Sequence, residues 1–184
     1  MRSRVISGDD RQYGPRSSDD VRATLLALAR DFLLAAGRVP GVRRIAMLGS
    51  LLTEKPRPKD VDLLVTVADD ADLTRLAQLG RRLKGTAQAR LNSGADIFLA
   101  DATGAYIGRI CHYRECHPRV LCRARHCGAV PHLADDLDIV SLDSDLVARP
   151  PLELFPTIVA RIALPVDVQR ILLADPNVTR SSET

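Results

Sequence analysis

Two periods of hydrophobic residues alternate along the chain, one typical of amphipathic helices and one typical of strands. Between Ser17 and Gly37, apolar residues recur at spacings of four and three, which places them on one face of a helix. Ser17 and Asp20 form a capping box at the start of this helix, and Gly37 provides its C-cap. The apolar face consists of Val21, Leu25, Leu28, Phe32 and Ala35.

Shorter apolar runs between turn residues predict strands. Pro40-Gly41 precedes the first run, and Asn92-Ser93-Gly94 separates two later ones. A second helix is expected over residues 70–84, because acidic residues mark its start, basic residues mark its end and Gly85 follows it. A short helix is expected over residues 166–173. The expected strands cover residues 42–48, 61–67, 86–91, 95–100, 105–110 and 137–142.

The order of these elements predicts a mixed α+β fold, in which helices flank a mixed sheet. A length of 184 residues is that of one domain. Residues 1–17 are polar and are expected to form a flexible leader, and residues 18–110 are expected to form the core. Residues 111–184 form a Cys/His-rich extension, which we expect to pack on the core within the same domain.

The composition excludes several classes of protein. Hydrophobic residues make up 46% of the chain and charged residues 27%, which is the balance of a soluble globular protein. No run approaches the roughly 18 apolar residues of a membrane span, and Met1 to Gly14 lacks the apolar core of a signal peptide, so we expect a cytoplasmic protein. A net charge of +3 is too weak to indicate nucleic acid, and 3% aromatic residues give little material for stacking bases.

The most informative stretch pairs a Gly-Ser turn with two nearby carboxylates. Gly49-Ser50 ends an apolar strand, and nine residues later Asp60-Val61-Asp62 opens another. Because side chains alternate along a strand, Asp60 and Asp62 share a face, with Cα atoms about 6.6 Å apart. Paired carboxylates at the start of an apolar strand repel one another unless a cation joins them, and Mg²⁺ prefers such oxygen ligands. Gly49 allows close approach of a ligand, and Ser50 adds a hydroxyl and an N–H for phosphate.

A third acid, Asp96, occupies the start of the strand expected over residues 95–100. If that strand lies beside the one at 61–67, three carboxylates converge over the Gly-Ser turn. Such a trio can hold two metal ions, one on the phosphates of a nucleotide and one on the attacking hydroxyl.

This pattern resembles the DNA polymerase beta-type nucleotidyltransferase superfamily, in particular its minimal bacterial members. The resemblance covers roughly residues 18–100 and rests on Gly49, Ser50, Asp60, Asp62 and Asp96. It implies that the three acids bind two Mg²⁺ ions, that Asp96 helps to activate the acceptor hydroxyl, and that Gly49 and Ser50 contact the outer phosphates of a nucleotide such as ATP.

The chain departs from the family pattern near the phosphates. Many members carry a small residue, an Arg and a Gly after Gly-Ser, where this chain has Leu51-Leu52-Thr53, and many carry Ser before the first acid, where it has Lys59. Lys59, with Lys55 and Arg57, could bind the nucleotide in their place; the alternative is a solvated loop.

All four cysteines and all four histidines fall within residues 111–132. Four thiolates in one short segment can close a tetrahedral zinc site, although the spacing is longer than in common zinc knuckles. Separately packed reduced thiols, and a disulfide or redox role, are the alternatives. Five arginines lie in or just before this segment, Arg109 among them, and could receive an anionic acceptor or pair with Asp135, Asp136 and Asp138. The candidate zinc ligands are Cys111, Cys116, Cys122 and Cys127.

Three functional hypotheses follow from these features. The first is a metal-dependent nucleotidyltransferase that transfers a nucleoside monophosphate from an NTP to a hydroxyl of an RNA such as tRNA, a protein or a small molecule. The second is a non-catalytic protein of the same fold that acts as an antitoxin or regulatory partner. The third is a zinc-stabilised nucleic-acid-binding module. Retention of all three acids favours the first over the second, and the scarcity of aromatic residues disfavours the third.

Overall fold

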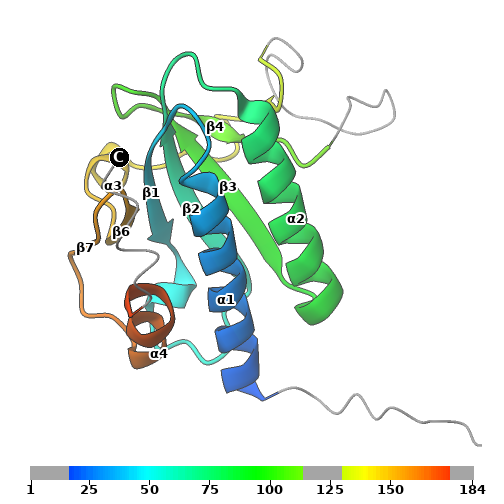
Figure 1. The fold of residues 1–184 in the computed structure, drawn as a ribbon, viewed down its shortest axis with the longest axis vertical. Coiled ribbons are helices and arrows are strands. Elements are labelled where there is room, and N and C mark those ends of the chain that lie inside the picture. Colours follow the sequence, from blue (N-terminus) through cyan, green and yellow to red (C-terminus); the bar gives the residue numbers. More distant parts are fainter. Residues whose placement is uncertain (1–16, 114–129, 175–184) are drawn as a thin grey trace, which may run out of the picture.

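A single seven-stranded mixed sheet organises the computed structural model, which describes residues 17–113 and 130–174 (Figure 1). The strands are β1 (Val42–Leu48), β2 (Asp60–Val67), β3 (Gly94–Ala100), β4 (Tyr106–Ile110), β5 (Leu133–Ala134), β6 (Leu152–Phe155) and β7 (Val159–Ala160). Their order is β5-β4-β3-β2-β1-β6-β7, with β2 and β3 parallel and every other pair antiparallel. The prediction of a mixed sheet flanked by helices is therefore confirmed.

Two long helices, α1 (Ser18–Ala36) and α2 (Leu73–Leu91), lie side by side on one face of the sheet (Figure 1). The predicted start of α1 is confirmed, since the Ser17 side chain accepts a hydrogen bond from the Asp20 N–H at 3.1 Å. Gly37 caps its C-terminus, also as predicted. None of the described helices is long and apolar enough to cross a membrane.

The two faces of the sheet are covered differently. On β2, Val61, Leu63 and Val65 point toward α1 and α2 and belong to the main hydrophobic core. Leu64 points the other way, into a smaller cluster beneath α3 (Ser144–Ala148), where Val147 is fully buried. This second face has much less cover, and it is the face that carries the candidate site.

The strand predicted over residues 86–91 is wrong, because α2 continues to Leu91. Gly85 does not stop the helix. Its position is exposed, and Ala87 continues the buried face one turn after Leu83. The helix ends instead at Asn92, which adopts a left-handed conformation with φ 53°. One exposed glycine costs a helix only about 1 kcal/mol, which the buried face of α2 readily offsets.

The strand predicted over residues 137–142 is also wrong. The Asp136 carbonyl accepts hydrogen bonds from the N–H groups of Ile139 and Val140, so the backbone folds into a turn there. The edges of the sheet are formed by segments that the sequence pattern did not indicate, β5 beside β4 and both β6 and β7 beside β1. The short C-terminal helix is confirmed as α4 (Val166–Val168), which continues as a π-helical turn over Gln169–Leu173.

The course of α2 through Gly85 predicts a simple effect on stability. A Cβ added at Gly85 would meet nothing within 4 Å, whereas one added at Gly80 would lie 3.3 Å from Ile97 Cγ1. Gly85→Ala should raise the free energy of unfolding by about 1 kcal/mol through helix propensity alone. Gly80→Ala is the matched control and should gain less, because its methyl group crowds the sheet. Urea denaturation of both variants measures the difference, and a loss of stability in Gly85→Ala would contradict the helix.

Candidate functional site

The three acids predicted from the sequence lie at the same end of two neighbouring parallel strands. In the register of β2 and β3, Asp62 is the direct partner of Asp96, and Asp60 is the partner of Gly94. Partners in register point to the same face, and Asp60, Asp62 and Asp96 therefore share the face that is turned away from α1 and α2. Leu48, the last residue of β1, pairs with Asp62 from the other side, so the Gly49-Ser50 turn begins directly beside that carboxylate.

Two glycines make room for the first two carboxylates. Gly49 has φ 77° and ψ −162°, a conformation that favours glycine, and a Cβ there would lie 2.1 Å from Asp62 Oδ2. A Cβ at Gly94 would lie 2.3 Å from Asp60 Oδ1, and the Gly94 N–H donates a hydrogen bond to that oxygen at 2.9 Å. Both glycines are thus required by side chains of the site.

Asp62 is the carboxylate whose charge is least compensated. Burial, followed by the negative charges of Asp60 and Asp96, raises its pKa to about 6. Because the pKa is higher in the folded state than in the unfolded chain, the folded protein holds this proton more tightly. The stabilisation is complete below about pH 4 and is lost as the pH rises through about 6. At neutral pH the site therefore carries an ionised carboxylate that has no ion-pair partner among the described residues.

Asp96 has the opposite environment. Its Oδ1 lies 3.0 Å from His112 Nε2, 3.6 Å from Arg109 Nη1 and 3.8 Å from Lys84 Nζ. The hydrogen bond with His112 is the main reason that the pKa of Asp96 falls below its ordinary value, and Lys84 and Arg109 lower it further. Asp96 is consequently held in its ionised form.

The sequence pattern gave His112 and Lys84 no role beside Asp96. The antiparallel pairing of β3 and β4 explains why His112 lies beside Asp96, since the residues that follow β4 return to the level at which β3 begins. Arg109 also forms a close ion pair with Asp136, which confirms one of the two interpretations of its charge. His112 Nδ1 is buried and has no hydrogen-bond partner in the part of the chain that the structure describes.

The donor chemistry of the site fits a hard divalent cation. Asp60, Asp62 and Asp96 offer carboxylate oxygens. Burial and the two neighbouring carboxylates raise the pKa of Asp62, and a bound cation would oppose that shift. Across residues 17–113 and 130–174, no three His, Cys, Asp or Glu side chains are already gathered around one metal position. One oxygen of each outer carboxylate is already engaged: Asp60 Oδ1 accepts a hydrogen bond from the Gly94 N–H, and Asp96 Oδ1 is bonded to His112 Nε2.

The residues predicted to contact the nucleotide lie next to the acids. Ser50 opens a 3-10 turn, in which the N–H groups of Leu52 and Thr53 donate to the Gly49 and Ser50 carbonyls. Lys59 is exposed and lines an open groove of about 820 Å³, together with Asp60. The same groove is lined by two further cations, Arg57 and Arg90, and by the polar residues Gln88, Asn92 and Ser93.

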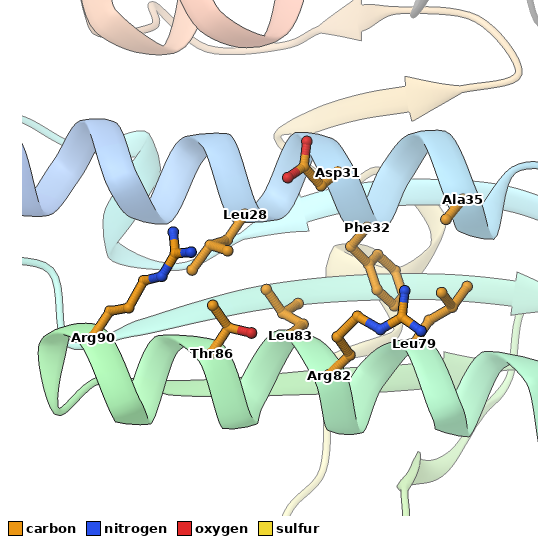
Figure 2. Close-up of a pocket in the computed structure, with 9 residues that line it drawn as sticks. All are labelled: Leu28, Asp31, Phe32, Ala35, Leu79, Arg82, Leu83, Thr86 and Arg90. Atoms are coloured by element: carbon orange, nitrogen blue, oxygen red, sulfur yellow. The ribbon is translucent and has the colours of Figure 1, made fainter.

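A separate hollow of about 310 Å³ lies between α1 and α2 (Figure 2). Its lining comes from the two helices alone and includes Leu28, Phe32 and Leu83. Because these helices cover the face of the sheet opposite the carboxylates, the hollow is not part of the candidate site.

The predicted zinc ligands fall mostly outside the described residues. Cys111 directly follows β4, and its N–H donates to the His132 carbonyl at 2.7 Å. Cys116, Cys122 and Cys127 belong to residues 114–129, which the structure does not describe. The zinc site therefore stays a prediction.

Comparison with known proteins adds little to this geometry. No protein-family model matches the chain, and no curated protein matches it. Among solved structures, the chain is similar to one described as a "putative nucleotidyltransferase" from Sulfolobus solfataricus, with 13% sequence identity and a TM-score of 0.33. The similarity covers 53% of this chain and 92% of that one. Values this low carry no argument for a function, which is therefore inferred from the residues of this chain.

The contact between Gly49 and Asp62 predicts an unusually sensitive position. Gly49→Ala should destabilise the protein by more than Gly104→Ala, because both glycines have positive φ but only Gly49 would also meet a carboxylate. We expect about 1–3 kcal/mol from the backbone conformation at either position, with a further loss at Gly49. Chemical denaturation of both variants measures the two losses. Equal losses in the free energy of unfolding would show that the Asp62 carboxylate does not contact the Gly49 backbone.

Proposed function

We propose that the protein is a divalent-cation-dependent nucleotidyltransferase, which transfers a nucleoside monophosphate from an NTP to a hydroxyl acceptor and releases pyrophosphate. The observation that carries the proposal is the register of β2 with its two neighbours: pairing with β3 sets Asp62 beside Asp96, and pairing with β1 sets it against the Gly49-Ser50 turn. That arrangement juxtaposes an uncompensated negative charge with a turn whose backbone can approach phosphate. The fold alone supports only a mixed α+β protein.

Each residue of the candidate site would have its own role in this reaction. Asp60 and Asp62 would hold Mg²⁺, which supplies charge neutralisation on the phosphates and on the attacking oxygen. Gly49 and Ser50 would position the outer phosphates of the NTP, and Lys59 would add positive charge from the adjoining groove. Asp96, which is held ionised, would accept a hydrogen bond from the acceptor hydroxyl and orient its oxygen toward the α-phosphorus.

One observation favours a second candidate, a non-catalytic protein that binds a partner. Asp96 already lies within 4 Å of three basic side chains, which lowers its need for a cation. A regulatory protein of this type would keep the acids as part of its structure. The two candidates differ in whether Asp62 is needed for transfer of label from a nucleotide.

We expect Asp62→Asn to abolish transfer while leaving the fold intact. The wild-type protein is incubated with Mg²⁺, cell extract and each α-labelled NTP in turn, and the label is located on RNA, on protein or on a small molecule. Loss of one group that stabilises transition-state charge lowers rates by about a hundredfold or more. Because the substitution removes repulsion with Asp60 and Asp96, the melting temperature should stay the same or rise slightly.

Asp69→Asn is the matched control, since Asp69 is an exposed acid that follows the far end of β2. It should transfer label as the wild-type protein does. Transfer at the wild-type rate by Asp62→Asn would contradict the proposed mechanism. Absence of transfer by the folded wild-type protein with every NTP would favour the non-catalytic candidate.

A further inference from the structure

Arg22 is a buried charge that the proposed reaction does not use. It lies on α1 and is only 7% exposed, although arginine is among the residues least often buried. A buried guanidinium is tolerated only when its hydrogen-bond donors find partners. The identity of those partners therefore indicates what the residue does.

Each of the five N–H donors of Arg22 is bonded. Nε and one N–H of Nη2 donate to the two carboxylate oxygens of Asp167, at 2.7 and 3.1 Å. The remaining three donate to backbone carbonyls, those of Leu51 at 3.1 Å, Thr53 at 3.0 Å and Lys55 at 2.8 Å. A guanidinium supplies five donors in a planar fork, and this site engages all of them.

The three carbonyls belong to the segment that directly follows the Gly49-Ser50 turn. Leu51 and Leu52 are buried, but residues 53–57 are exposed and gain little from apolar packing. Arg22 thus anchors the exposed part of the loop to α1. Asp167, on α4, aligns the guanidinium from the other side, which brings three distant parts of the chain together at one side chain.

We propose that Arg22 and Asp167 are positioning residues, which form a clamp that sets the conformation of the Gly49-Ser50 turn. The clamp rests on the contacts above, and its effect on nucleotide binding rests on the proposed function. Arg22 lowers the pKa of Asp167, chiefly through their hydrogen bond, so the carboxylate is ionised at neutral pH and the clamp is closed. Through the clamp, the C-terminal segment that contains Asp167 influences how the turn meets phosphate.

The test uses Asp167→Asn, which leaves the three carbonyl contacts of Arg22 available but removes the charge that aligns it. Glu153→Gln is the matched control. The Glu153 carboxylate is also paired with arginine, but it lies on β6, and its partners are Arg161 at 2.8 Å and Arg44 at 3.7 Å rather than a residue that bonds the loop. Hydrogen–deuterium exchange of the Leu52 and Thr53 amides is measured without nucleotide, and KM and kcat are measured with NTP.

We expect the loop amides to exchange about tenfold faster in Asp167→Asn, since hydrogen bonds to charged groups are among the stronger ones. KM for the NTP should rise by a similar factor with kcat little changed, and Glu153→Gln should alter neither quantity. Arg22→Lys should reproduce the effect on exchange, because an ammonium group cannot replace the planar fork.

Unchanged loop exchange in Asp167→Asn would overturn the clamp. Faster exchange throughout the chain in both Asp167→Asn and Glu153→Gln would also overturn it, because the pair would then serve general stability. Faster exchange confined to the loop, in a protein that transfers no label, would support the clamp and count only against the proposed function.

Discussion

The contact between the Asp62 carboxylate and the Gly49 backbone is the constraint on which the rest of the site depends. It requires glycine at position 49, since a Cβ would lie 2.1 Å from Asp62 Oδ2. It also requires β1 and β2 to pair with Leu48 opposite Asp62 and β3 to place Asp96 on the other side. A shift of one residue in either register would move the acid to the opposite face of the sheet.

The charges around this contact are arranged unequally. Asp62 faces two carboxylates and has no ion-pair partner within residues 17–113 and 130–174, whereas Asp96 faces a histidine, an arginine and a lysine. Neighbouring carboxylates with such different surroundings are typical of sites in which each acid has its own role. In the proposed reaction Asp62 would hold a cation and Asp96 a hydroxyl group. The folded chain retains the repulsion between these carboxylates at a cost in stability.

Local signals predicted the part of the site that lies within the strands. The positions of Asp60, Asp62 and Asp96 follow from alternation along strands and from the Gly-Ser turn. The sequence could not indicate that α2 runs through Gly85, because what stabilises the last turns of the helix is the burial of Ala87, which depends on the tertiary fold. Arg22 was missed for a similar reason: its only signal is an arginine next to the apolar face of α1, and its partners are as many as 145 residues away.

The most direct measurement is a pH titration of the Asp62 carboxyl carbon by NMR, with and without Mg²⁺. The account predicts a pKa of about 6 in the protein without added metal. Addition of Mg²⁺ should lower that pKa, because a bound cation favours the ionised carboxylate. A pKa near the ordinary value of 3.8 without metal would contradict the buried repulsion, and a raised pKa that does not respond to Mg²⁺ would contradict the cation site.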